Sequence, residues 1–301
     1  MSKHDDDTFI ELKGIVKQYG GVTALDNVDF RVKTGEAICL AGENGSGKST
    51  LIKILVGVEQ PTSGQIFVDG KPYSHVNPRQ AAASGISVIF QDFSIFSNLT
   101  VAENIAFATQ LSGKKRLFDR GATRRIAQEA LDRIGVDIDL DARVETIPVA
   151  HKQLVAICRG LASNARLIIM DEPTTALTGR EVQALLGIIR KLKDSGIAVV
   201  FVSHKLAEVL EVCEEVFVLR NGRNVAEGPA RDFNAASLTR HMTGRDVPEA
   251  KPPLNIDQAE TLLVVEKLGK EGAFADINFE LKAGEVLGIS GVLGSGRTSL
   301  A

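Results

Sequence analysis

The sequence predicts an α/β fold in which a mostly parallel sheet is buried between layers of helix. The first observation behind this is a set of short, uninterrupted apolar runs, which are typical of strands covered on both faces. The runs are Ala37–Ala41, Leu167–Met170 and Ala198–Val202. The second observation is that apolar residues recur with helical spacing elsewhere in the chain. The helical segments are Arg124–Ile134, Val149–Leu161, Glu181–Leu192 and Lys205–Val212.

Two other segments extend this core. Phe9–Val16 and Val28–Val32 alternate apolar and polar residues, which predicts half-exposed strands of an antiparallel β subdomain. A helix-rich insertion at about 93–163 precedes the apolar run that ends in Asp171. We therefore expect a helical subdomain inserted into the α/β core.

The composition excludes several functional classes. Lys plus Arg (35) nearly balance Asp plus Glu (38), and a net charge of −3 offers no broad basic surface for nucleic acid. The three cysteines lie far apart without CxxC spacing, which indicates reduced, buried thiols and no metal or redox site. No apolar run approaches the roughly 20 residues of a spanning helix, and residues 1–8 form a polar tail unlike a signal peptide. Any membrane role is expected to come through a partner.

A glycine-rich loop follows the strand Ala37–Ala41 and precedes the helical run Thr50–Val56. Its sequence, GENGSGKS, fits GxxxxGK[ST], and both flanking elements are the ones that a phosphate loop requires. The predicted phosphate-binding residues are Gly42, Glu43, Asn44, Gly45, Ser46, Gly47, Lys48, Ser49 and Thr50. Lys48 is expected to reach the β- and γ-phosphates and Ser49 to ligate Mg²⁺. The core is thus predicted to be that of a P-loop NTPase.

An acidic pair, Asp171-Glu172, closes the apolar run Leu167–Met170. A buried strand delivers such carboxylates to the edge of the sheet beside the phosphate loop. Asp171 is the predicted Mg²⁺ partner, because Mg²⁺ prefers oxygen ligands and keeps several waters. Glu172 is the predicted general base for the water that attacks the γ-phosphate.

The chain contains an internal repeat. Residues 28–51 and 277–300 share alternating apolar positions, a Gly-Glu pair, an apolar strand and a glycine loop, and the two loops lie about 250 residues apart. The predicted organisation is a tail (1–8), a first nucleotide-binding domain (9–243), a proline-containing linker (244–260) and the truncated start of a second such domain (261–301). We expect a longer protein, since residues 261–301 hold too few elements for a core of their own.

These motifs resemble the ATP-binding cassette (ABC) family over about 9–245. Tyr19 matches the family's adenine-stacking aromatic, Gln91 its Q-loop glutamine and His204 its switch histidine. Taken singly, these three have ordinary explanations as a core residue, a turn residue and a helix cap; in this order, they favour the family. The resemblance implies ATP and Mg²⁺ as ligands, a metal and water contact for Gln91, and a hydrogen bond from His204 to the γ-phosphate.

Further details resemble the tandem cassettes that energise import of monosaccharides and related polyols. Thr178 stands where most cassettes have an aspartate, and the second loop has Arg297 in place of the lysine. The signature segment falls at Ile147–His151, where Pro148 replaces a serine that contacts the opposite γ-phosphate. Both departures concern one composite site of a cassette pair. The other site, built on Lys48, Glu172 and His204, is predicted to hydrolyse ATP, which makes the motor asymmetric.

The resemblance implies particular partners and a location. We expect integral membrane permease subunits, a second nucleotide-binding domain and, indirectly, a periplasmic sugar-binding protein, with the chain on the cytoplasmic face of the bacterial inner membrane. Two alternatives stay open: a soluble tandem-cassette ATPase acting on ribosomes, and a non-hydrolysing nucleotide-binding fragment. Arg297 and the proline-bearing linker disfavour the ribosomal class, which is expected to keep a lysine in both loops and a long charged linker.

Overall fold

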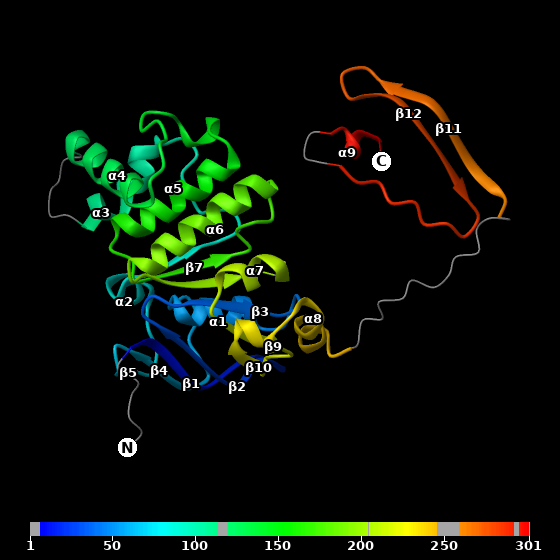
Figure 1. Ribbon diagram of the computed structural model, residues 1–301. Coiled ribbons are helices and arrows are strands. Elements are labelled where there is room, and N and C mark those ends of the chain that lie inside the picture. Colours follow the sequence, from blue (N-terminus) through cyan, green and yellow to red (C-terminus); the bar gives the residue numbers. More distant parts are fainter. Residues whose placement is uncertain (1–6, 113–118, 204, 246–258, 292–294, 301) are drawn as a thin grey trace. The chain divides into compact units, whose positions relative to one another are not determined.

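The computed structural model describes residues 7–112, 119–203, 205–245, 259–291 and 295–300 (Figure 1). The predictions that fall on His204, on most of the linker and on the middle of the second glycine loop therefore lie outside the described residues. The chain divides into two compact units, Met1–Val247 and Pro248–Ala301, and the division falls within the predicted linker. Each unit is described by itself.

A six-stranded sheet forms the centre of the first unit, in the order β10-β9-β3-β8-β7-β6. Its strands are β3 (Ala37–Ala41), β6 (Ile86–Ile89), β7 (Leu167–Asp171), β8 (Ala198–Val202), β9 (Glu215–Arg220) and β10 (Arg223–Pro229). All neighbours pair in parallel except β9 and β10, which form an antiparallel hairpin. The parallel α/β core predicted from the apolar runs is confirmed, and β3 and β8 have the predicted bounds.

Both faces of this sheet are buried, which explains why its strands read as continuous apolar runs. In β3, Ile38 and Leu40 belong to one core cluster, whereas Cys39 belongs to a second cluster on the opposite face. The same alternation occurs in β7, where Ile169 and Met170 pack into different clusters. Because both faces of these strands are buried, every position takes an apolar residue. The alternation of apolar and polar residues that is typical of a half-exposed strand is therefore absent from the sequence.

An antiparallel sheet, ordered β2-β1-β4-β5, packs with helix α1 against one face of the parallel sheet (Figure 1). Its strands are β1 (Thr8–Tyr19), β2 (Val22–Lys33), β4 (Ser63–Val68) and β5 (Lys71–Tyr73). The first two strands are longer than the predicted Phe9–Val16 and Val28–Val32, because a hairpin extends their pairing to Tyr19 and Val22. The predicted antiparallel subdomain is confirmed.

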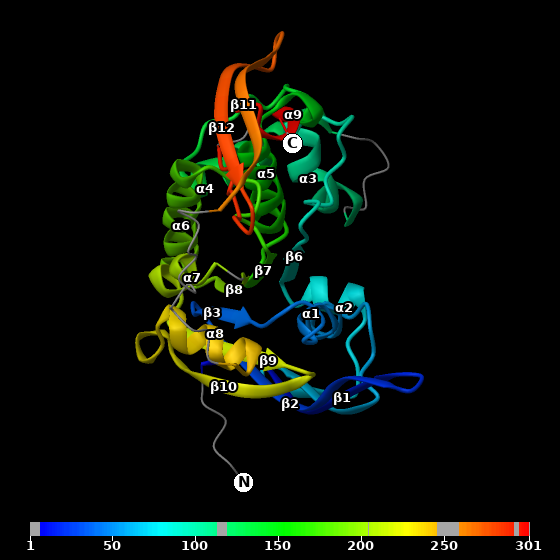
Figure 2. The same ribbon diagram turned by 90° about the vertical axis from the view of Figure 1, so that its right-hand side faces the viewer.

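Helices cover the other face, and Figure 2 shows α3, α4 and α5 on the side of the parallel sheet away from β1 and β2. The helices of the first unit are α1 (Lys48–Leu55), α2 (Pro78–Ala83), α3 (Val101–Ser112), α4 (Arg120–Ile134), α5 (Val149–Ala162), α6 (Gly179–Asp194), α7 (Leu206–Val212) and α8 (Ala235–Thr243). Two 3₁₀ turns lie at Val144–Thr146 and Ala230–Asp232. Since α3, α4 and α5 all lie between β6 and β7, the inserted helical subdomain is confirmed. No helix of the described residues has the length and apolar character needed to cross a membrane.

The second unit contains a β-hairpin, β11 (Thr261–Lys270) with β12 (Phe274–Lys282), and a short helix, α9 (Arg297–Leu300). Its local contacts match those of the first repeat. The N–H of Lys282 donates to the Glu285 carboxylate at 2.8 Å, as that of Lys33 donates to Glu36 at 2.9 Å. No residue of 259–291 or 295–300 is buried. A two-stranded hairpin of this kind is marginal without a packing partner.

Candidate nucleotide-binding site

The phosphate loop connects β3 to the first turn of α1. Gly42 has φ 154°, Gly45 has φ 80° and Gly47, the N-cap of α1, has φ 110°. A Cβ at Gly42 would lie 2.4 Å from the carbonyl oxygen of Leu219 and 2.5 Å from the Oγ of Ser46. Only glycine allows this backbone path, which directs the amides at the N-terminus of α1 towards a bound anion.

Lys48 folds back over the loop that precedes it. Its Nζ donates to the carbonyl oxygens of Gly42 at 2.7 Å and of Glu43 at 2.9 Å. Burial lowers the pKa of Lys48, whereas the charges of Glu172 and Asp171 raise it. The ammonium is therefore held in the loop by carbonyls that a phosphate oxygen can replace, as expected for a cation that binds a nucleotide.

The acidic pair lies where β7 ends. Burial raises the pKa of Asp171, and the neighbouring Glu172 raises it further, while Lys48 lowers it. Glu172 has the left-handed φ of 49°, its N–H donates to the carbonyl oxygen of Val202 at 2.9 Å, and its carboxylate accepts from Thr175 Oγ1 at 3.3 Å. A glutamate in this conformation costs about 1–3 kcal/mol and persists where contacts hold it, often at functional sites.

A cavity of about 520 Å³ brings the loop and the acidic pair together. Predicted residues that line it are Asn44, Gly45, Gly47, Lys48, Ser49, Thr50, Gln91, Asp171 and Glu172. The structure adds five residues that the sequence analysis missed, namely Val22, Thr23, Ala24, Asn221 and Gly222. The Asn-Gly pair is a strong hairpin signal and indeed joins β9 to β10. Its position beside the phosphate loop depends on a long-range contact, from the N–H of Gly222 to the carbonyl oxygen of Ser46 at 2.9 Å.

Some predicted residues do not line this cavity. Gly42, Glu43 and Ser46 are not among the residues that line it, and Ser46 Oγ is buried without a hydrogen-bond partner among the described residues. Tyr19 is 43% exposed, and its ring lies 4.7 Å from the Lys17 ammonium. The structure therefore does not bring Tyr19 into the lining, and its contact with adenine stays a prediction.

Oxygen donors for a magnesium ion converge on the same cavity. Ser49, Gln91 and Asp171 supply a hydroxyl, an amide carbonyl and a carboxylate, which is a donor set that suits Mg²⁺. Gln91 and Asp171 also line an adjoining cavity of about 470 Å³, so water has access to them. The residues present thus fit the ion, which they would share with the nucleotide phosphates.

Arg159 fixes the segment that follows Gln91. This arginine was not predicted as a site residue from the sequence. Its guanidinium donates to the carbonyl oxygens of Ser94 at 2.6 Å and of Phe93 at 3.3 Å. Phe93 and Ser94 have left-handed φ values of 59° and 45°, and burial lowers the pKa of Arg159. A cation on α5 thereby holds two strained residues in the loop that carries Gln91.

Arg159→Met is expected to loosen this loop and to lower the free energy of unfolding by about 2 kcal/mol, since two charge-assisted hydrogen bonds are lost. Amide hydrogen exchange of residues 92–95 should rise well above that of the unaltered protein. Arg125→Met is the matched control, because among the described residues Arg125 forms only an exposed pair with Glu129, its neighbour on α4. Unchanged exchange at 92–95 would contradict the proposed anchoring.

The signature segment opens α5, as the sequence predicts. Pro148 is the N-cap of this helix and provides no side-chain cap, and Val149 follows as the first helical residue. The helix survives because proline lacks only an amide that the first turn leaves unbonded. The hydroxyl and amide that a serine would present at this end are absent.

The fold and the loop together define a P-loop nucleotide-binding protein, and comparison with known proteins makes the family specific. The chain belongs to the ABC transporter family, whose model, described as "ABC transporter", matches residues 25–175. It is 46% identical over 292 residues to the "Ribose import ATP-binding protein RbsA 1" of Rubrobacter xylanophilus, and 42% identical over 300 residues to the "Ribose import ATP-binding protein RbsA" of Corynebacterium glutamicum. These matches cover 97% and 100% of this chain but only 58% and 57% of the two relatives.

Solved structures show the same fold. A cassette named MJ1267, in its ADP conformation, matches with a TM-score of 0.67 and 25% identity over 77% of this chain and 94% of its own. A cassette named MJ0796, bound to ADP and Pi as a dimer, matches with a TM-score of 0.65 and 27% identity over 74% of this chain and 100% of its own. The predicted P-loop NTPase fold of the ABC type is confirmed.

Proposed function

We propose that this chain binds and hydrolyses ATP as the cassette subunit of an importer for a monosaccharide or related polyol. The observation that carries the proposal is the convergence of Lys48, Asp171 and Glu172 on one cavity at the N-terminus of α1. The ribose import proteins that it resembles support the sugar class. Because the chain spans less than three fifths of these relatives, the activity of the whole protein belongs to the proposal.

The geometry of the described residues supports the proposed chemistry, and the role of His204 comes from the family resemblance. Lys48 exchanges its two carbonyl partners for the β- and γ-phosphates, and the amides of the loop bind the same oxygens. Ser49, Gln91 and Asp171 would hold Mg²⁺, which neutralises phosphate charge when bound. Glu172 accepts the proton of the attacking water, and His204 donates a hydrogen bond to the γ-phosphate.

The proposed motor has one hydrolytic and one regulatory site. Arg297 reaches back to the carbonyl oxygen of Gly291 at 3.5 Å, much as Lys48 reaches that of Gly42. A planar guanidinium does not replace the compact ammonium of a phosphate loop, and Pro148 removes a donor from the signature segment. Each change is expected to weaken phosphate binding at its own segment, whereas the site around Lys48 keeps its own residues.

The proposed location is the cytoplasmic face of a bacterial inner membrane. There the chain would contact integral permease subunits and a second nucleotide-binding domain, and act indirectly with a periplasmic sugar-binding protein. Closure of two cassettes around ATP and their reopening after hydrolysis would move the permease.

The proposal is tested by measuring ATP binding and ATP turnover of the purified protein, with Mg²⁺ and then with the ion chelated. Binding together with Mg²⁺-dependent turnover is the expected result, and turnover should rise when permease and sugar-loaded binding protein are added. Binding without turnover under all these conditions would favour the non-hydrolysing fragment. Stimulation by ribosomes in place of the permease would favour the ribosomal class.

A further inference from the structure

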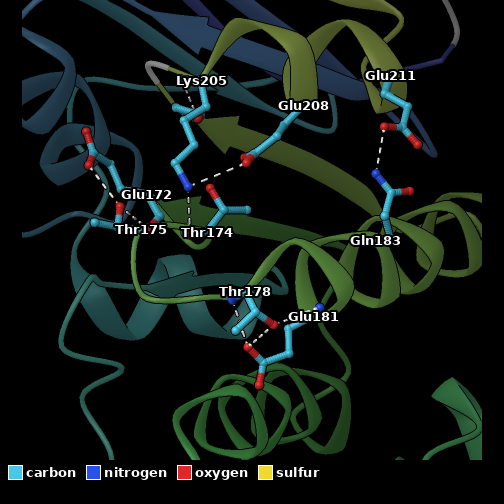
Figure 3. A network of polar contacts seen from close by, with 10 residues as sticks. Glu172, Thr174, Thr175, Thr178, Glu181, Gln183, Lys205, Glu208 and Glu211 are labelled. Carbon is cyan, nitrogen blue, oxygen red and sulfur yellow. Dashed lines mark hydrogen bonds and ion pairs between the residues drawn. The ribbon is translucent and has the colours of Figure 1, made fainter. Parts of the chain in front are cut away.

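Two loops leave neighbouring strands at the edge of the sheet where Glu172 lies. One follows β7 and carries residues 172–178, and the other follows β8 and includes Ser203 and Lys205. The two strands are parallel neighbours, with Asp171 paired to Val202. Figure 3 shows the side chain of Lys205, from the loop after β8, directed at the segment that follows Glu172.

Lys205 makes a contact that its sequence position alone does not predict. Its Nζ donates to the carbonyl oxygen of Thr174 at 2.9 Å and lies 3.5 Å from Glu208 Oε1 (Figure 3). Thr174 is 1% exposed, and its carbonyl oxygen also accepts the N–H of Leu177 at 3.2 Å, which closes a turn. The ammonium thus ties this turn to the neighbouring loop.

Hydrogen bonds hold the main chain of Lys205 and the following helix α7 in place. The main-chain N–H of Lys205 donates to Ser203 Oγ at 3.0 Å. Helix α7, which begins at Leu206, is fixed to α6 because Glu211 accepts from Gln183 at 3.1 Å (Figure 3). Glu211 also accepts from Arg190 of α6 at 2.7 Å. The contacts that hold the main chain of Lys205 and α7 in place therefore do not involve the turn at Thr174.

The segment on the other side begins with the predicted base. Glu172 is in a left-handed conformation and accepts a hydrogen bond from Thr175 Oγ1. At its far end, Thr178 caps α6 together with Glu181, whose carboxylate accepts the N–H of Thr178 at 2.8 Å. Between these ends, Thr174 is the point at which the neighbouring loop holds the segment.

We propose that Lys205 is a positioning residue for Glu172, because its ammonium fixes the turn at Thr174 and with it the strained backbone that directs the Glu172 carboxylate into the cavity. The inference rests on the proposed function, in which Glu172 acts on the water that attacks ATP. A purely structural role, as an i,i+3 partner of Glu208, would contribute little to stability and would leave turnover unchanged. The positioning role instead predicts a specific loss of turnover.

Lys205→Met should lower kcat at least 10-fold and leave the dissociation constant for ATP within 2-fold, since the polar partners of Lys205 in the described part of the chain are Ser203, Thr174 and Glu208 and not the phosphate loop. Lys205→Arg keeps a cation and a donor and is expected to recover part of the rate. The double variant Lys205→Met, Glu208→Met controls for the Glu208 carboxylate, whose Oε2 is buried without a hydrogen-bond partner among the described residues. It should be as slow as Lys205→Met.

A double-mutant comparison separates positioning from general damage. Adding Lys205→Met to Glu172→Gln should cause no further loss of turnover if both act through the same carboxylate. A kcat within 2-fold of the unaltered protein, a matching loss of ATP affinity, or recovery of the rate in the Glu208 double variant would overturn the proposal. Absence of turnover in the unaltered protein would instead overturn the proposed function and, with it, this role of Lys205.

Discussion

Replacing Glu172 by glutamine is expected to lower ATP turnover at least 100-fold while ATP binding is retained. The amide has the shape of the carboxylate and can still accept from Thr175 Oγ1, so the left-handed backbone keeps its contacts. What is lost is the group that takes a proton from water, and general bases contribute about 10²–10⁴-fold. Removal of a negative charge near Lys48 does not weaken phosphate binding. Steady-state turnover and equilibrium ATP binding of the full transporter measure the two effects separately.

Glu181→Gln is the matched control for this substitution. Glu181 lies in the first turn of α6, the helix that follows the loop carrying Glu172, and caps α6 at Thr178; glutamine also satisfies a capping box. The turnover of the Glu181→Gln variant should stay close to that of the unaltered protein. Because the loop with Arg297 and the segment with Pro148 are each proposed to bind phosphate weakly, neither is expected to compensate for Glu172→Gln. Retention of half the original rate would contradict both the role of Glu172 and the asymmetry.

Much of the fold could be predicted because the buried strands are locally encoded. Residues of β3 and β8 pack on both faces, so each is an uninterrupted apolar run that ends where the sheet ends. The sequence analysis missed β4 and β5, which are short and largely exposed. They are stabilised by pairing next to β1 rather than by a pattern of their own. Local sequence carries little information about a strand of that kind.

The candidate site was predictable to the same extent. Lys48 and Ser49 follow from one loop, and Asp171 and Glu172 from one strand end. Arg159 and Lys205 act on carbonyl oxygens 66 and 31 residues away, and a carbonyl acceptor leaves no mark in the sequence. Asn221 reaches the cavity only because β9 lies beside β3 in the sheet. The residues proposed to perform chemistry could thus be predicted from the sequence, whereas those that hold them in place required the structure.

Gly42→Ala is the second substitution with a large expected effect, and it should abolish measurable ATP binding. The new Cβ would lie 2.4 Å from the carbonyl oxygen of Leu219 in β9 and 2.5 Å from Ser46 Oγ. Relief requires movement of backbone in the central sheet or of the loop itself, and the φ of 154° is strained for alanine. Either movement displaces the carbonyl of residue 42, which holds Lys48. Calorimetric titration with ATP and thermal unfolding of the variant measure the two consequences.

Two other glycines separate the causes of this effect. Gly45 lies in the same loop with φ 80°, but a Cβ there meets nothing within 4 Å, so Gly45→Ala tests backbone strain without collision. Gly21 has neither a left-handed φ nor a neighbour within 4 Å, so Gly21→Ala should leave stability and ATP binding unchanged. The expected order of ATP affinity is therefore Gly21→Ala above Gly45→Ala above Gly42→Ala. If Gly42→Ala bound ATP as tightly as Gly45→Ala, collision with β9 could not be what makes glycine necessary at the start of the loop.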